Sequence, residues 1–364
     1  MALSNWFSLC LPGRTGRGGS GFGHGGKGSG GEGKENRLAT SSGSIFIDLS
    51  TLEAATGNFC EANLLGRGGF GPVYKGVMTN GQEVAVKQLS IDSRQGAREF
   101  TNEVTLLLKV QHRNLVSLLG CCVANGRKML VLPFFPNRSL DYFLFDKSRQ
   151  TPLDWSKRFE ITVGVARGLL YLHEESPVKI VHRDIKASNI LLDDQLNPKI
   201  SDFGLARLFS ADETHVNTFR ISGTYGYMAP EYALNGYLSS KSDVFSFGIL
   251  LLEIVSGRKN LDETLGVKEV DLLSYAWKLY QEGSELKIMD PNLASYNADE
   301  ASLCIQIGLL CCQASVSDRP DMYGVHLMLS SDSFTLPKPG SPGIRGRIGG
   351  WLSAPSLLSN TNSH

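Results

Sequence analysis

The sequence predicts an α+β fold of two lobes, an N-terminal lobe built on a sheet and a mainly helical C-terminal lobe. Strand-like alternation begins at Asn63 and contains Asn80-Gly81 between two apolar runs, which is a strong hairpin signal. From Trp155 onward the apolar residues recur at helical spacing instead. Between these patterns lies Pro133-Phe134-Phe135-Pro136, which cannot continue a central strand and predicts a stiff connector.

The composition narrows the class of protein. The 36 Lys and Arg residues are balanced by 36 Asp and Glu residues, whereas a dedicated nucleic-acid-binding protein is expected to be basic. No apolar run approaches the roughly 20 residues that span a bilayer. The seven cysteines include no C-x-x-C pair, so neither zinc nor a disulfide framework is indicated. We therefore expect reduced thiols in a cytosolic protein, with no nucleic acid among its partners.

Both ends of the chain are predicted to lack regular structure. Residues 1–43 include a glycine-rich stretch that cannot bury enough apolar surface to become ordered. Residues 335–364 are again rich in glycine, proline and serine, which predicts a flexible tail. Cys10 lies among apolar residues and is a candidate for palmitoylation, with a plain disordered start as the alternative.

Helices and further strands follow from apolar spacing. A lead-in helix is expected over residues 44–58, where Leu49 and Leu52 share one face. Residues 241–256 are apolar on several faces, which is typical of a buried central helix. The other expected helices cover residues 96–110, 155–173, 274–282, 300–312 and 321–329, and the other expected strands cover residues 115–121 and 128–132.

A glycine pattern marks the first hairpin. Gly66, Gly68 and Gly71 match G-x-G-x-x-G at a strand–turn–strand, where backbone N–H groups can approach a phosphate closely. The same pattern in the N-terminal tail arises from composition alone and is rejected. The match does not lead into a helix, so a dinucleotide fold is not indicated. Taken alone, phosphate binding and a plain glycine turn both stay open.

Lys87 ends the apolar run Val84-Ala85-Val86. Such a lysine is either a surface residue with an extended stem or a phosphate contact. Glu103 lies sixteen residues later, at the edge of the apolar face of the helix that follows, and Glu99 is the rival partner.

Polar residues at fixed spacing fill residues 180–231. Asp184, Lys186 and Asn189 lie within six positions, and Asp202 follows thirteen residues after Asn189. So many polar groups between apolar runs are hard to explain as packing.

Together these motifs resemble the eukaryotic protein kinase family over residues 59–334. The motifs, in order, are the glycine loop, Lys87, Glu103, His182-Arg183-Asp184, Asn189, Asp202-Phe203-Gly204 and Ala229-Pro230-Glu231. The resemblance implies a two-lobed fold: an N-lobe (59–135) with a five-stranded antiparallel sheet and one regulatory helix, and a mainly helical C-lobe (136–334).

The resemblance also assigns roles. Asp184 would act on the substrate hydroxyl and Lys186 on the γ-phosphate of ATP, while Lys87 would contact the α- and β-phosphates, fixed by Glu103. Asn189 and Asp202 would hold Mg²⁺. The residues around the nucleotide would be Leu65, Gly66, Arg67, Gly68, Gly69, Phe70, Gly71, Val73, Ala85, Lys87, Leu132, Pro133, Phe135 and Leu191.

Further positions of the family pattern have structural roles or depart from it. Glu231 and Arg319 would form an ion pair, and Asp243 would brace the catalytic loop. Pro133 departs from the pattern, because relatives usually carry an acidic residue there. The position needs only a carbonyl acceptor, so we expect ATP binding to survive.

Lys186 together with Gly223-Thr224 resembles serine/threonine kinases rather than tyrosine kinases. The segments LGRGGFGPVYKG and HRDIKASNILLD are similar to plant receptor-like kinases, in particular the cysteine-rich group. With no ectodomain or membrane span in the sequence, the chain resembles a receptor-like cytoplasmic kinase, and a truncated receptor is the rival explanation. A cytoplasmic location is implied, and peripheral attachment to the plasma membrane through Cys10 stays open.

Arg183 before Asp184 implies control by phosphorylation of the activation loop. Thr218, which lies in the middle of that loop, is the first candidate, and solvated hydroxyls on a permanently ordered loop are the alternative.

We therefore predict a serine/threonine kinase in plant signalling that acts on protein substrates, with an upstream receptor kinase as a partner. A pseudokinase scaffold is the main alternative, and RNA binding by the glycine-rich tail is a weaker one.

Overall fold

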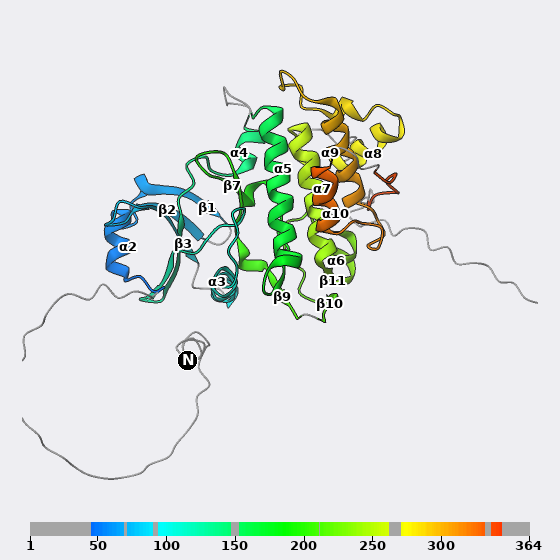
Figure 1. The fold of residues 1–364 in the computed structure, drawn as a ribbon. Coiled ribbons are helices and arrows are strands. Elements are labelled where there is room, and N and C mark those ends of the chain that lie inside the picture. Colours follow the sequence, from blue (N-terminus) through cyan, green and yellow to red (C-terminus); the bar gives the residue numbers. More distant parts are fainter. Residues whose placement is uncertain are drawn as a thin grey trace, which may run out of the picture.

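The computed structural model describes residues 45–68, 71–89, 94–146, 153–210, 212–261, 271–331 and 336–343. Within these residues the chain forms a sheet-based lobe and a mainly helical lobe side by side (Figure 1). The predicted α+β class is confirmed. The expectations for the N-terminal tail, Cys10, Gly69, Phe70 and most of the C-terminal tail lie outside the described residues.

The N-lobe sheet has five antiparallel strands in the order β1-β2-β3-β5-β4, as predicted. The hairpin at Asn80-Gly81 is confirmed, because Val77 pairs with Glu83 and Gly81 adopts a positive φ of 83° in the turn. The strands are β1 (Leu64–Gly68), β2 (Gly71–Val77), β3 (Glu83–Leu89), β4 (Gly120–Ala124) and β5 (Arg127–Pro133).

The two faces of this sheet have different partners. Val84 and Val86 face one way and pack with Leu52 of helix α2 (Leu49–Thr56) in a small apolar core. Since side chains alternate along a strand, Ala85 and Lys87 point to the opposite face. Figure 1 shows α2 on the outer side of the sheet, so the face of Lys87 is turned toward the rest of the molecule.

Helix α3 (Arg94–Leu107) confirms the helix expected over residues 96–110. The strand expected over residues 115–121 is wrong for residues 115–119, since β4 begins at Gly120. These residues connect to the C-lobe instead: the Val116 N–H donates to the Ile200 carbonyl at 2.9 Å, and the Ile200 N–H donates to the Asn114 carbonyl at 2.8 Å. Strand β5 includes Pro133, which pairs with Val84, so the connector begins at Phe134, one residue later than predicted.

The C-lobe is built around helix α7 (Ser240–Ser256), which is buried along almost all of its length, as predicted. Helix α5 (Trp155–Leu170) continues into a π-helical turn, η2 (Tyr171–Glu175), and so covers the predicted residues 155–173. The other helices are α4 (Leu140–Phe145), α6 (Pro230–Asn235), α8 (Leu272–Gln281), α9 (Ala298–Cys311) and α10 (Met322–Ser330).

Three two-stranded sheets of the C-lobe were not predicted. They pair β6 (Lys179–Val181) with β9 (Arg207–Phe209), β7 (Ile190–Leu192) with β8 (Pro198–Ile200), and β10 (His215–Asn217) with β11 (Tyr237–Ser239). Each is only three residues long, too short for a periodic signal in the sequence.

Residues 336–343 differ from the flexible tail expected from residue 335. Their backbone contacts the C-lobe: the Gly343 N–H donates to the Cys312 carbonyl at 2.9 Å, and the Gly340 N–H donates to Gln313 Oε1 at 2.7 Å. Pro342 and Gly343 are buried, so this proline- and glycine-rich segment packs on the lobe rather than leaving it.

Two further observations concern the described part of the chain. No helix there is both long and apolar enough to cross a membrane. All six cysteines in it are free thiols, and five of them are buried.

Candidate active site

The loop from His182 to Asn189 lies between β6 and β7, and its backbone is hydrogen-bonded to Asp243 of α7. Asp243 Oδ2 accepts the His182 N–H at 2.7 Å, and Oδ1 accepts the Arg183 N–H at 2.8 Å. Arg183 has a φ of 72°, a conformation that a non-glycine residue adopts only when its surroundings enforce it. The bracing role that the family resemblance implied for Asp243 is therefore visible as two hydrogen bonds.

Asp184 lies at the centre of a polar cluster. Lys186 Nζ is 2.8 Å from Asp184 Oδ2, the Thr224 hydroxyl donates to Oδ1 at 2.6 Å, and Asn189 Nδ2 donates to Oδ2 at 3.0 Å. Burial on its own would raise the pKa of Asp184, but Lys186 and the hydrogen bonds outweigh burial and the pKa is lowered. Asp184 is therefore an ionised carboxylate at neutral pH.

Lys87 joins both lobes through two carboxylates. Its Nζ lies 3.0 Å from Glu103 Oε2 and 2.7 Å from Asp202 Oδ1. The rival Glu99 instead accepts a hydrogen bond from Gln95 Nε2 at 3.0 Å. Only 11% of the Lys87 side chain is exposed, so it is not an extended surface lysine.

The opposite charges around Lys87 stabilise its protonated form. Burial would lower the pKa of Lys87, but Glu103 and Asp202 together outweigh burial and raise it. Burial raises the pKa of Glu103, and the adjacent ammonium of Lys87 opposes that rise. The lysine is therefore held as a cation at the junction of β3, α3 and the segment after β8.

Asp202 has a left-handed backbone, with φ 69° and ψ 68°. The following turn η4 (Phe203–Leu205) packs on α3, where Asn102 Nδ2 donates to the carbonyls of Phe203 at 3.0 Å and Ala206 at 2.7 Å. The role of Asn102 could not be predicted from the sequence, because an isolated asparagine in a helix belongs to no motif. It ties the helix that carries Glu103 to the segment that carries Asp202.

The strand register gathers the residues expected around the nucleotide. Val73 lies opposite Lys87, and Ala85 lies opposite Leu132, so these side chains share the face of Lys87. Leu191 of β7 joins from the C-lobe, where it bridges Ser139 just after the connector. Of the remaining expected positions, Leu65, Gly66, Arg67 and Gly68 lie on β1, Gly71 begins β2, Pro133 ends β5, and Phe135 follows that strand by two residues.

Among the described residues, no group of three or more His, Cys, Asp or Glu side chains is arranged to bind a metal without other ligands. Asn189 and Asp202 are nevertheless neighbours, because the N–H and hydroxyl of Ser201 both donate to the Asn189 carbonyl at 2.9 Å. A carboxylate and an amide oxygen, completed by phosphate oxygens and water, are the donor set that Mg²⁺ accepts. The residues present therefore fit this ion.

One ion pair and a set of hydrogen bonds to Glu253 hold the segment after the loop. Arg319 contacts both carboxylate oxygens of Glu231 at 2.8 Å, as the resemblance implied. Glu253 of α7 accepts the Tyr227 hydroxyl at 2.7 and 2.9 Å and the Asn260 N–H at 2.9 Å. The contacts of Glu253 could not be predicted from the sequence, because a single glutamate within an apolar run belongs to no motif.

The Arg183 side chain makes several hydrogen bonds in the structure. Its guanidinium donates to the Leu205 and Arg220 carbonyls at 3.1 Å and to the Tyr232 hydroxyl at 3.2 Å. The Thr218 N–H donates to the Gly236 carbonyl at 2.9 Å. The expected switch residues therefore lie in one hydrogen-bonded region but do not contact each other directly.

Comparison with known proteins agrees with this geometry. The family model for protein tyrosine and serine/threonine kinase matches residues 60–329. Cysteine-rich receptor-like protein kinase 4 of Arabidopsis thaliana is 52% identical over 308 residues, which cover 84% of this chain and 46% of the relative. The G-type lectin S-receptor-like serine/threonine-protein kinase B120 of the same plant is 52% identical over 309 residues, which cover 85% of this chain and 36% of the relative. The chain thus spans less than half the length of either relative. With a family model matched along most of its length, the chain belongs to the protein tyrosine and serine/threonine kinase family.

Proposed function

We propose that this chain is a serine/threonine protein kinase that transfers the γ-phosphate of ATP to hydroxyls of protein substrates in plant signalling. The observation that carries the proposal is the position of Lys87 Nζ, within 3.0 Å of both Glu103 and Asp202. This contact joins three distant segments around one cation, as a site for ATP phosphates requires. A pseudokinase scaffold is less favoured, because such a role does not need this arrangement.

In the reaction, the ionised Asp184 orients the substrate hydroxyl and accepts its proton. Lys186, which lies beside Asp184, neutralises charge on the γ-phosphate, and Lys87 holds the α- and β-phosphates. Asn189 and Asp202 would hold Mg²⁺, which supplies charge neutralisation at the phosphates when bound. Most of the catalysis is therefore positioning by groups that the fold already holds in place.

The adenine would lie on the apolar face formed by Val73, Ala85, Leu132 and Leu191, with Leu65 at its edge. The Pro133 carbonyl and the Phe135 N–H of the connector would meet the polar edge of the base. The backbone from Gly66 to Gly71 would cover the phosphates, and that range includes Arg67, Gly68, Gly69 and Phe70. We propose residues 59–334 as the kinase domain, preceded by the lead-in helix.

The preference for serine and threonine rests on Thr224. Its hydroxyl bridges Asp184 and Lys186, at 2.6 and 2.7 Å, and so shapes the place where the substrate hydroxyl must lie. The relative B120 is itself named a serine/threonine-protein kinase.

The proposal also includes a cellular location and an upstream partner for the kinase. Free thiols throughout the described residues are typical of a reducing compartment, which supports a cytoplasmic location. Similarity to receptor-like kinases supports an upstream receptor kinase as a partner. Phosphorylation of Thr218 would give the loop around Arg183 a new anionic contact.

Phosphate transfer to a generic protein substrate tests the proposal. Wild type should label serine and threonine, and Asp184→Asn should lose the signal by several orders of magnitude. Asp194→Asn, at an exposed aspartate of the β7–β8 turn, is the matched control and should retain it. Equal labelling by wild type and Asp184→Asn would favour the pseudokinase reading instead.

A further inference from the structure

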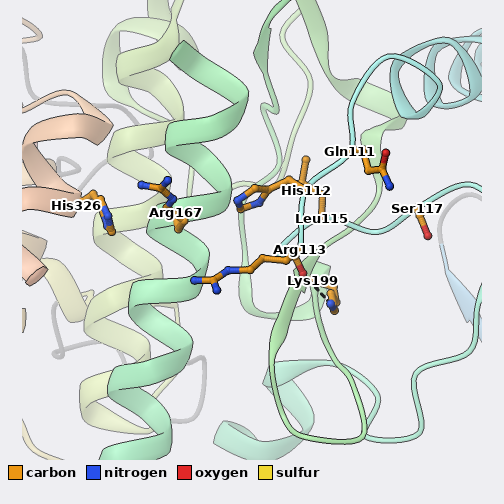
Figure 2. A pocket seen from close by; sticks show the side chains of 8 residues that line it. All are labelled: Gln111, His112, Arg113, Leu115, Ser117, Arg167, Lys199 and His326. Carbon is orange, nitrogen blue, oxygen red and sulfur yellow. Dashed lines mark hydrogen bonds between the residues drawn. The ribbon is translucent and has the colours of Figure 1, made fainter. Parts of the chain in front are cut away.

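A basic cavity lies between the segment after α3, helix α5 and helix α10 (Figure 2), with a volume of about 780 Å³. None of the proposed active-site residues lines it. The lining residues are Gln111, His112, Arg113, Leu115, Ser117, Arg167, Lys199 and His326. No carboxylate is among them, while three are permanent cations and two are histidines.

The cations are incompletely paired. Within the described residues, the Arg113 guanidinium has no hydrogen-bond or ion-pair partner. Arg167 lies 3.6 Å from Glu175, and Lys199 lies 3.5 Å from Asp193, so both carboxylates approach at the limit of hydrogen-bond distance or beyond it. Lys199 Nζ also donates to the Arg113 carbonyl at 2.7 Å, which fixes the lysine beside the arginine.

His112 is oriented as a donor. Its Nδ1 accepts the Asn114 N–H at 3.2 Å, so the neutral ring carries its proton on Nε2. The ring stacks on Tyr171 at a centroid distance of 4.9 Å, and Figure 2 shows it pointing from the loop toward Arg167. Burial lowers the pKa of His112, and Arg167 and Arg113 lower it further.

His326 approaches from α10 on the other side. Burial and then Arg167 lower its pKa, and its Nδ1 has no hydrogen-bond partner among the described residues. Both histidines therefore lie in a positive field that the neighbouring carboxylates do not cancel.

We propose that this cavity binds a phosphoryl dianion through Arg113 and Arg167, with Lys199 and the His112 Nε2–H as further donors. Two guanidinium groups facing one space suit the oxygens of a phosphate better than a single carboxylate, because each can donate two parallel hydrogen bonds. The ligand is either free inorganic phosphate or a phosphorylated side chain of a protein partner, which share this group.

The site lies on a segment connected to the active site. Asn114 and Val116 bracket Ile200 of β8 with two hydrogen bonds, and Asp202 follows two residues later. A bound anion would therefore hold the segment that links α3 to Asp202.

Proton NMR of the two histidines in the full chain tests the proposal without requiring kinase activity. His112→Gln and His326→Gln assign the signals. Inorganic phosphate, compared with chloride at equal ionic strength, should raise the pKa of both rings by on the order of one unit. The double variant Arg113→Gln/Arg167→Gln should abolish the effect, and Arg127→Gln, at the distant β4–β5 turn, should retain it.

A phosphoserine peptide and its unphosphorylated form separate the two sources. A rise with the phosphopeptide identifies a phosphorylated side chain, whereas a rise with inorganic phosphate alone identifies a free anion. Unchanged histidine pKa values with either probe, or an equal rise in the double variant, would overturn the proposal. Binding near Lys87 cannot mimic the result, since the signals come from residues lining the basic cavity.

Discussion

The Thr224 hydroxyl lies between opposite charges, donating to Asp184 Oδ1 and accepting from Lys186 Nζ. In Thr224→Ala the pKa of Asp184 should rise, because one contact that lowers it is lost while the burial stays. A hydrogen bond to a charged group contributes about 1.5–3 kcal/mol, so kcat should fall roughly 10- to 100-fold. The acid limb of the pH–kcat profile should move to higher pH.

Thr224→Ser is the matched control for this change. It keeps the hydroxyl and should stay close to wild type in kcat and in its pH profile. If the alanine and serine variants behaved alike, the hydroxyl would have no part in setting the state of Asp184.

Two buried glutamates on α3, Glu99 and Glu103, allow the effect of the contact with Lys87 to be distinguished from the effect of burial. Glu103→Gln removes the carboxylate paired with Lys87, whereas Glu99→Gln changes a residue whose visible contact is with Gln95. The first should raise the KM for ATP about tenfold or more, on the scale of a lost charge-assisted hydrogen bond. The second should leave it unchanged. Steady-state kinetics at varied ATP checks both, and a larger effect of Glu99→Gln would reverse the assignment.

At the scale of elements, the sequence predicts those helices and turns whose structure depends on residues close together in the chain. The apolar run of α7 and the turn at Asn80-Gly81 specify their own structure, so both were found close to their observed limits. Residues 115–119 carry the side chains of a strand, yet the Val116 N–H donates to the Ile200 carbonyl, more than 80 positions away, while the Leu119 N–H donates to the Val131 carbonyl of β5. The same reason hides the docked residues 336–343, whose partners Cys312 and Gln313 belong to the lobe and not to the segment.

Arg158 connects helix α5 to α7 and to the segment that contains Asp290. We therefore predict that this contact stabilises the C-lobe. Its fully buried guanidinium donates to the Ile254 carbonyl of α7 at 2.8 Å and to Asp290 Oδ2 at 2.6 Å. Asp290→Asn would leave a buried cation without its counter-charge, at a cost of about 3–5 kcal/mol in unfolding free energy. Glu282→Gln, which breaks an exposed pair with Lys278, should cost less than about 1 kcal/mol. Denaturant unfolding measures both, and equal effects would contradict the buried-pair account.

At the scale of the whole molecule, the proposed site is a meeting of distant segments. The sequence named Lys87, Glu103, Asp184 and Asp202 because their spacing resembled a family, not because the pattern alone places them together. Asn102 and Glu253 escaped notice, since their importance lies in what the fold brings to them: the turn after Asp202 and the hydroxyl of Tyr227. Motifs thus identify residues with reactive groups more readily than residues that position them.

The buried carboxyl of Glu253 makes the stability of the folded chain depend on pH. Burial raises its pKa to about 7, although the Asn260 N–H and the Tyr227 hydroxyl oppose the rise; Asp141 adds to it and Lys259 reduces it. A carboxyl whose pKa is raised on folding adds stability that is fully present below its unfolded pKa and is lost as the pH rises through about 7.

Glu253→Gln should therefore change how stability depends on pH. Relative to wild type, the variant should gain on the order of 3 kcal/mol in unfolding free energy between pH 5 and pH 8, because it removes a buried charge that forms only at the higher pH. Denaturant unfolding at several pH values measures the difference, which cancels the other titrating groups, the histidines included. Glu282→Gln should run parallel to wild type. Parallel curves for Glu253→Gln as well would show that its carboxyl titrates alike in the folded and unfolded chain, and that the contact between α7 and Tyr227 tolerates the charge at neutral pH.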